Sequence, residues 1–205
     1  MTQQYTIPRR RSGRLLMLVP ILLLLGGCGT QGPPHFQLNE STGITLPEAG
    51  WITQSMEREQ LLEVEYHGKV EHLHVILTME SENVRLVVLS PMGILLSEAV
   101  YAEGRVSSTQ RFPGMQIPPP QQVLGDILMC YLPVDAWREA LPSGWVLADD
   151  PDGARRLRDH AGELVSEIHF AEGSPDSIRD PISIRHFTFG YQIEIETLER
   201  RSSSE

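Results

Sequence analysis

Two histidines, His72 and His74, have the spacing that brings two imidazoles to one face of a strand, as some metal sites require. The positions that alternate with them, Leu73, Val75 and Leu77, are all apolar. Because the apolar face of a half-buried strand packs on the core, the histidines are expected to point toward solvent. The pattern therefore predicts no metal site.

The acidic run Asp149–Gly153, with the sequence DDPDG, contains three carboxylates that could bind calcium. It lacks the alternating ligands and the closing glutamate of an EF-hand loop. Asp-Pro-Asp-Gly is instead typical of a turn between two strands. G-x-S-x-G, S-x-x-K and P-loop patterns do not occur in the sequence, so it indicates no catalytic residue, no metal and no cofactor.

Three glycines, Gly27, Gly29 and Gly32, spell the G-x-G-x-x-G pattern of dinucleotide-binding turns. Such a turn must open a helix, because the N–H groups at the helix N-terminus hold the pyrophosphate. Here Pro33 and Pro34 follow, and the next residues show no helical periodicity. The nucleotide interpretation is therefore rejected.

A signal peptide explains the same segment from its first residue. Four arginines within residues 9–14 precede an apolar core at 15–25, which is too short for an ordinary spanning helix. Two glycines then precede Cys28, and residues 25–28 (LGGC) look like the bacterial lipobox, where the cysteine thiol is diacylated and the chain is cut just before it. The sequence thus predicts a signal peptide over residues 1–27 and lipidation of Cys28.

The other cysteine, Cys130, would then have no disulfide partner. It lies in the strongly apolar segment QVLGDILMCYLP. The expected state is a buried, inert thiol.

Net charge and the residue after Cys28 bear on the location. Removing residues 1–27 removes four of the 17 basic residues and none of the 27 acidic ones, which leaves a net charge of −14. So acidic a surface argues against nucleic acid or anionic headgroups as partners, and attachment to a membrane must come from the lipid. Gly29 stands where an aspartate would indicate inner-membrane retention. The expected location is therefore the outer membrane, with the protein lipid-anchored and facing the periplasm.

The remaining chain is expected to consist of a lipidated tether over 28–48, one domain over 49–200 and a disordered tail over 201–205. The tether is rich in Gly, Pro, Gln, Ser and Thr, and about twenty such residues reach roughly 60 Å when extended. On this basis the domain would work well away from the membrane surface.

Hydrophobic periodicity predicts strands, then helices, then strands. Period-two patterns over 50–110 indicate an antiparallel meander of about five strands, in which Ser90-Pro91-Met92-Gly93 forms one turn. Helical spacing over 121–132 predicts a helix, and Pro133 opens a second, shorter one. Strand patterns resume at 145–147, 163–169, 182–190 and 192–196.

The expected fold is α+β, mainly antiparallel β: an unclosed sheet whose apolar concave face is covered by a short helical lid. An ordinary α+β domain with a solid core is the alternative that the pattern leaves open.

The order of these features resembles the LolA/LolB lipoprotein carriers, above all LolB: a lipobox cysteine, a tether, the Ser-Pro-Met-Gly hairpin, a helix ending near Leu132-Pro133, then Trp137, Leu141, Pro142 and Gly144 before more strands. More closely, LGDILMCYLPVDAWREALPSGW, GELVSEIHF and GYQIEIETLE resemble a family of uncharacterised bacterial lipoproteins associated with aryl-polyene lipid genes. The similarity covers residues 50–199. It implies a LolB-like half-barrel whose cavity holds acyl chains. It also implies that the residue at the hairpin tip, Met92 here where the family has leucine, contacts the membrane.

The ligand cavity is expected between sheet and lid, lined by Leu73, Val75, Leu77, Leu124, Ile127, Leu128 and Tyr131. The predicted function is non-enzymatic: an outer-membrane lipoprotein that binds or accepts an acylated molecule (a lipid, a lipoprotein or an aryl-polyene lipid) for transport or insertion. A non-catalytic structural adaptor of an envelope complex is the alternative. Cavity size separates the two, because a carrier needs roughly several hundred Å³ of apolar space and an adaptor needs none.

Overall fold

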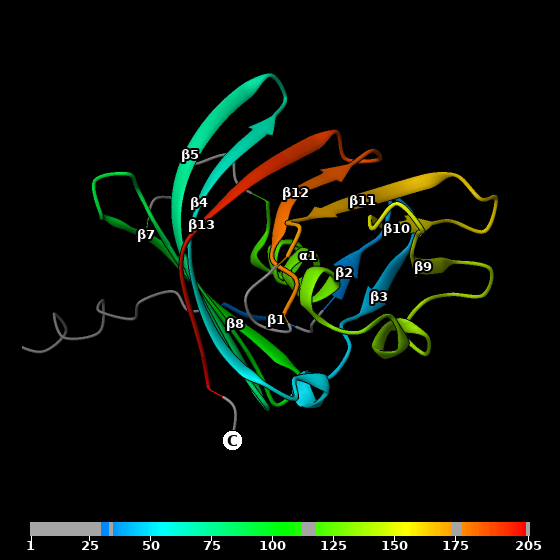
Figure 1. Ribbon diagram of the computed structural model, residues 1–205, viewed down its shortest axis with the longest axis horizontal. Coiled ribbons are helices and arrows are strands. Elements are labelled where there is room, and N and C mark those ends of the chain that lie inside the picture. The colour runs from blue at the N-terminus through cyan, green and yellow to red at the C-terminus, as the bar shows by residue number, and fades with distance from the viewer. Residues whose placement is uncertain (1–29, 33–34, 112–117, 174–177, 204–205) are drawn as a thin grey trace, which may run out of the picture.

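The computed structural model describes residues 30–32, 35–111, 118–173 and 178–203. Most of this part of the chain forms one antiparallel sheet of eleven strands, in the order β1-β8-β7-β6-β5-β4-β13-β12-β11-β10-β9. The sheet curves around helix α1 (Pro120–Tyr131) and does not close, because β1 and β9 form its two edges (Figure 1). The mainly antiparallel, unclosed architecture expected from the sequence is thus confirmed.

The strand bounds are β1 (Thr30–Gly32), β2 (His35–Gln37), β3 (Gly43–Thr45), β4 (Ser55–Tyr66), β5 (Lys69–Glu80), β6 (Asn83–Leu89), β7 (Leu95–Ala102), β8 (Arg105–Gln110), β9 (Val146–Asp149), β10 (Arg155–Arg158), β11 (Leu164–Phe170), β12 (Pro181–His186) and β13 (Tyr191–Ser203). Two short 3-10 helices, η1 (Ala49–Trp51) and η2 (Val134–Trp137), complete the described elements.

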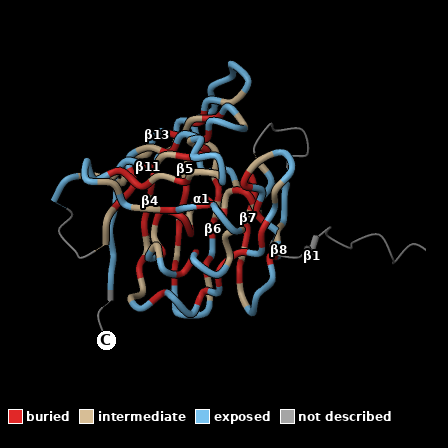
Figure 2. The backbone as a smooth tube through the Cα atoms, turned by 90° about the vertical axis from the view of Figure 1, so that its right-hand side faces the viewer, coloured by how far each residue is buried: buried red, intermediate tan, exposed pale blue. Residues whose placement is uncertain are grey.

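The predicted five-strand meander corresponds to β4 through β8. Two of its turns have two residues each, and both residues of each turn have positive φ: 50° and 72° at His67 and Gly68, 50° and 67° at Glu103 and Gly104. This conformation is that of a type I′ hairpin, whose twist matches the strands beside it. Buried positions alternate along these strands and mark the concave face (Figure 2).

Strand β13 joins the two halves of the sheet. It pairs with β4 from Tyr191 opposite Tyr66 to Ser203 opposite Ser55. The expected disordered tail is therefore wrong for residues 201–203, which continue the strand. Their polar side chains gave no strand signal, because this end of β13 is held by backbone pairing and not by burial of an apolar face.

The expected tether is wrong over residues 35–48, which belong to the folded domain. Strands β2 and β3 form a small hairpin, and Phe36, Leu38, Ile44 and Leu46 between them and beside them are buried in the core. The ring of Phe36 packs edge-on against Trp137, with ring centroids 6.1 Å apart. Composition suggested a linker because four apolar residues are spread thinly among polar ones.

Helix α1 is buried on two sides. One side faces the concave surface of the large sheet, and the other meets the β2–β3 hairpin, where a Cβ added to Gly125 would lie 2.1 Å from Cδ2 of Phe36. Such a distance is far below contact, so a glycine is required at this point of the helix. The predicted lid is therefore a central element, covered on its outer side.

The C-terminal end of α1 is held by Arg155 of β10. Its Nη1 donates to the carbonyl oxygens of Met129, Cys130 and Leu132 at 2.8, 3.3 and 2.7 Å. These are carbonyls that the helix itself leaves without partners. Nε and Nη2 of the same arginine donate to the carboxylate of Asp149 at 2.9 and 3.1 Å. One buried side chain thus fixes the lid to the second half of the sheet.

Candidate ligand cavity

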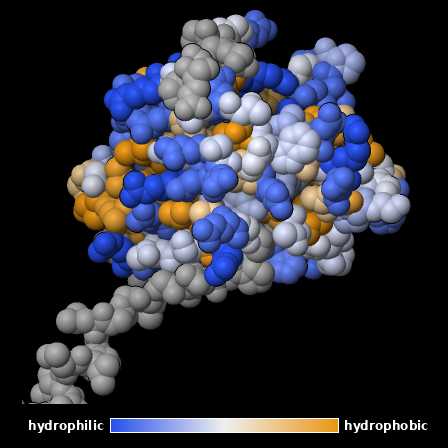
Figure 3. Space-filling model, turned by 90° about the horizontal axis from the view of Figure 1, so that it is seen from below, coloured by the Kyte–Doolittle hydropathy of each residue, from blue (hydrophilic) through white to orange (hydrophobic). Residues whose placement is uncertain are grey.

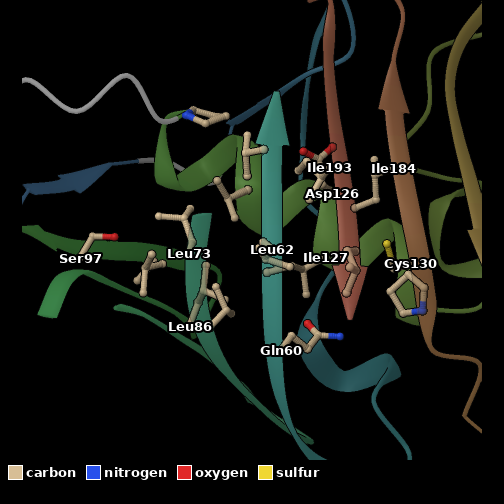
Figure 4. Close-up of a pocket in the computed structure, with 18 of the residues that line it drawn as sticks. Gln60, Leu62, Leu73, Leu86, Ser97, Asp126, Ile127, Cys130, Ile184 and Ile193 are labelled. Carbon is tan, nitrogen blue, oxygen red and sulfur yellow. The ribbon is translucent and has the colours of Figure 1, made fainter. Parts of the chain in front are cut away.

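An apolar cavity of about 80 Å³ lies between α1 and the concave face of the sheet (Figure 4). Aliphatic side chains of β4, β5, β6, β12 and β13 form one wall, and one face of α1 forms the other. The lining residues are Gln60, Leu62, Val64, Leu73, Val75, Leu86, Val88, Ser97, Ala99, Pro118, Val123, Asp126, Ile127, Cys130, Tyr131, Pro181, Ile184, Ile193 and Ile195.

The structure brings four of the seven predicted cavity residues together: Leu73, Val75, Ile127 and Tyr131. The other three, Leu77, Leu124 and Leu128, are almost completely buried in the core, but they do not line the cavity. The apolar residues at 124 and 128 predict a cavity wall only for a lid that has a single buried face. Here the β2–β3 hairpin gives α1 a second one.

Several lining residues were missed from the sequence. Ile184 comes from β12, and Ile193 and Ile195 come from β13, which the order of strands places between β12 and β4. The alternation at 192–196 predicted a strand, but only the pairing of β13 with β4 shows that this strand faces the cavity. Asp126 was overlooked because it is one polar residue within an apolar helix pattern.

The size of the cavity limits what it admits. Its 80 Å³ is below the roughly 300–1,000 Å³ of pockets for drug-sized ligands, and therefore below the volume expected above for a carrier in a preformed cavity. It corresponds to about five to eight water-sized spheres. Since a methylene group occupies nearly the space of a water molecule, the cavity in this conformation fits one short stretch of alkyl chain.

Asp126 places a carboxylate in this apolar surrounding. The residue is 3% exposed, and its Oδ2 accepts a hydrogen bond from the Tyr191 hydroxyl at 2.6 Å. Burial raises the pKa of Asp126 to about 7, and the hydrogen bond from Tyr191 opposes this shift only in part. The second carboxylate oxygen, Oδ1, is buried and accepts no hydrogen bond from any described residue.

Gln60 lies at the opposite end of the cavity (Figure 4). Its amide nitrogen already donates two hydrogen bonds. Its Nε2 donates to the Tyr131 hydroxyl at 3.3 Å and to Oγ1 of Thr197 at 3.2 Å. Cys130, between the two ends, is buried as predicted. Burial raises the pKa of its thiol, which keeps it protonated and unreactive.

Met92 lies at the tip of the hairpin between β6 and β7. Ser90 shapes this turn, because its backbone oxygen accepts from the Gly93 N–H at 2.8 Å and its Oγ from the Ile94 N–H at 3.1 Å. Met92 is 83% exposed and Ile94 is 48% exposed. Apolar side chains gather at the left edge of Figure 3, on the side where Figure 1 shows the hairpin that leads into β7.

Strand β1 begins beside the middle of β7, away from the end of the sheet that carries this hairpin. Thr30 lies opposite Ser108 of β8, and Ser108 lies opposite Ala99 of β7, so β1 starts about 13 Å along the strands from Leu95, where the hairpin ends. Cys28 itself lies outside the described residues. It precedes Thr30 by two positions in the sequence.

The other candidate groups are occupied by neighbouring side chains. His74 Nε2 lies 2.7 Å from Oε1 of Glu59, and His72 is exposed beside Glu63, on the strand face opposite Leu73. Arg156 donates to Asp150 and Asp152, so the acidic run forms the predicted turn between β9 and β10 with its carboxylates bound by arginine. Within the described ranges no cluster of three metal-ligating side chains occurs.

No helix in the described part of the chain is both long and apolar enough to cross a membrane.

Comparison with solved structures finds similar folds at low sequence identity. A LolA superfamily protein from Nitrosomonas europaea shares 7% identity over 75% of this chain and 88% of that chain, with a TM-score of 0.45. A putative outer membrane lipoprotein-sorting protein domain from Vibrio parahaemolyticus shares 11% identity over 77% and 88% of the two chains, with a TM-score of 0.36. At these values the likeness concerns the fold and carries no argument on function.

No curated protein matches the sequence significantly. A family model, described as a protein of unknown function (DUF3261), matches residues 57–199. This range starts within β4 and ends within β13, so it contains both walls of the cavity, the Met92 hairpin and Arg155. The chain belongs to the DUF3261 family.

Proposed function

We propose that this protein is an outer-membrane lipoprotein that binds or accepts an acylated molecule in the cavity beneath α1. The observation that carries the proposal is an apolar space between the helix and the sheet, lined almost entirely by aliphatic side chains of the core. Moving an alkyl chain into such a space is favourable by about 0.8 kcal/mol for each buried methylene. Transfer then requires no catalysis, only the exchange of one apolar environment for another.

The small volume defines how the ligand is held. In the described conformation the cavity receives the end of one alkyl chain, and a longer chain enters only where α1 or its neighbours move aside. Arg155 holds the C-terminal end of α1 through three carbonyl oxygens, and Gln122 holds its first turn through Gln37 and Tyr191. The acylated ligand is a lipid, the acyl portion of a lipoprotein or an aryl-polyene lipid.

The anchor and the hairpin support a position close to the bilayer. Lipidation of Cys28, two residues before Thr30, would hold the domain directly at the membrane and not on a long tether. The hairpin with the exposed Met92 and Ile94 ends at Leu95, about 13 Å along the strands from the start of β1, and we propose that it contacts the same bilayer as the lipid on Cys28. In this arrangement Met92 contacts the outer membrane from the periplasm.

Filling the cavity tests the central claim. Val75→Phe places a larger side chain into the cavity and is expected to weaken binding of an apolar fluorescent probe at least roughly tenfold, the equivalent of about two lost methylene contacts. Ile76→Phe is the matched control, because Ile76 is the next residue on β5 and points to the opposite face. Binding to a chain starting at Gly29, followed by titration, measures both.

Retained binding in a folded Val75→Phe variant would exclude the cavity as the site. A folded parent protein that binds no apolar probe at all would exclude the carrier function and favour the structural adaptor.

Met92→Glu is expected to slow transfer of a bound fluorescent fatty acid to phosphatidylcholine vesicles several-fold, because a carboxylate at the tip opposes insertion into the bilayer. Ligand capture and the melting temperature should stay unchanged, since Met92 is exposed. The matched control is Ser81→Glu, at the exposed turn on the opposite end of β6. Equal transfer rates for the two variants would show that Met92 is an ordinary turn residue without a role in transfer.

A further inference from the structure

Asp126 Oδ1 is a buried carboxylate oxygen at one end of the cavity wall, and no described residue donates a hydrogen bond to it. Figure 4 shows the carboxylate beside Ile193, at the end of the cavity away from Gln60. A buried acceptor without a partner is rare in folded proteins and costs about 1–3 kcal/mol. Only 3% of Asp126 is exposed, so bulk water does not satisfy Oδ1.

The hydrogen bonds around Asp126 have a fixed direction. The backbone N–H of Gln37 can only donate, so Oε1 of Gln122 accepts from it at 3.3 Å. The Gln122 amide nitrogen then donates to the Tyr191 oxygen at 3.3 Å, and the Tyr191 hydroxyl donates to Asp126 Oδ2 at 2.6 Å. Asp126 is therefore the final acceptor of this series, which leaves Oδ1 for a donor that enters the cavity.

Resting on the function proposed above, we infer that Oδ1 of Asp126 binds a hydroxyl group on the apolar part of the ligand. The ligand class is a hydroxylated amphiphile, such as a long-chain alcohol or an acyl chain that carries a hydroxyl.

A hydroxyl fits this site better than other polar groups. It has one donor, which Oδ1 accepts, and its remaining lone pairs can accept from the carboxyl group when Asp126 is protonated. An ammonium has three donors, and Gln60 at the far end of the cavity already engages Tyr131 and Thr197. Two N–H groups of the ammonium would therefore lie unpaired among aliphatic side chains, at a high cost in binding free energy.

Two isomeric probes isolate the contribution of the hydroxyl. Decanol and methyl nonyl ether have the same atoms and nearly the same size, but only decanol donates a hydrogen bond. Their affinities are measured by displacement of an apolar fluorescent probe from a chain starting at Gly29, which keeps every described residue. At about pH 8.5, where Asp126 is mostly ionised, the parent protein is expected to bind decanol roughly tenfold more tightly, the effect of one hydrogen bond to a charged acceptor.

Variants then assign the preference to Asp126. In Asp126→Asn the amide oxygen must accept from Tyr191, because the direction of the series is fixed, and the NH₂ group faces the cavity. This group donates equally well to the alcohol and the ether, so the preference should disappear. Asp126→Leu combined with Tyr191→Phe removes both partners and should abolish it as well. Ser97→Ala, another polar residue of the cavity wall, should keep it.

Equal binding of the two probes to the parent protein would overturn the inference and leave the proposed function standing. A preference that survives in Asp126→Asn and in the double variant would also overturn it, and its loss in Ser97→Ala would assign the hydroxyl to Ser97. Failure of both probes to bind the folded parent protein would contradict the proposed function itself. Circular dichroism and the melting temperature of each variant separate loss of binding from loss of folding.

Discussion

Arg155→Met is expected to lower the free energy of unfolding by about 3–5 kcal/mol, because it leaves three buried carbonyl oxygens at the end of α1 without their donor. Methionine keeps much of the length and the apolar stem of the arginine, so the loss reflects mainly the hydrogen bonds and the ion pair. Asp149 remains partly exposed and can be solvated, which limits the cost on that side.

Urea unfolding followed by tryptophan fluorescence measures this effect, since Trp137 is fully buried next to the end of α1. Arg158→Met is the matched control on the same strand. Its guanidinium is 42% exposed and lies 3.7 Å from Asp150, a weak surface pair. If both variants lose the same stability, Arg155 is not the residue that fixes the lid.

The second large effect concerns pH. Asp126→Asn is expected to gain stability relative to the parent by about 4 kcal/mol as the pH rises from about 4 to about 8. The pKa of Asp126 is raised by burial from 3.8 to about 7, so the folded parent prefers the protonated carboxyl. This contribution to stability is fully present below the unfolded pKa and is lost as the pH rises through the folded one. The asparagine does not titrate and loses nothing.

The comparison between variant and parent also cancels the contribution of His186 to the pH dependence of stability, whose sign is opposite to that of Asp126. Burial lowers the pKa of His186 to about 4, so the neutral imidazole stabilises the fold above pH 6.5 and this stability is lost as the pH falls toward 4. In the parent alone the two contributions nearly cancel between pH 4 and 6.5. Unfolding free energies of both proteins at several pH values isolate Asp126, and a difference that does not vary with pH would show that its carboxyl is solvated or paired.

Local patterns identified most elements because their causes are local. The period of two along Leu73, Val75 and Leu77 records a strand with one buried face, and the spacing of Val123, Ile127 and Tyr131 records a helix, whatever surrounds them. The turn at Ser90–Gly93 and the hairpin at Asp149–Gly153 follow from residues whose backbone preferences are their own.

The sequence by itself thus determined the strands β4–β8, helix α1 and four of the cavity residues, and its N-terminal segment supports the prediction of a lipidated Cys28. Only the tertiary structure decided which side of α1 faces the cavity. The Phe36 ring against Gly125 gives the helix a second buried face, and this contact joins residues far apart in the chain. The same holds for Asp126, an ordinary polar residue in the sequence. Its pKa is raised because the surrounding elements bury it, and only the fold shows that Tyr191 of β13 bonds one carboxylate oxygen and leaves the other without a described donor. Periodicity reports how an element divides core from solvent, whereas the chemistry of a buried group depends on the elements that surround it.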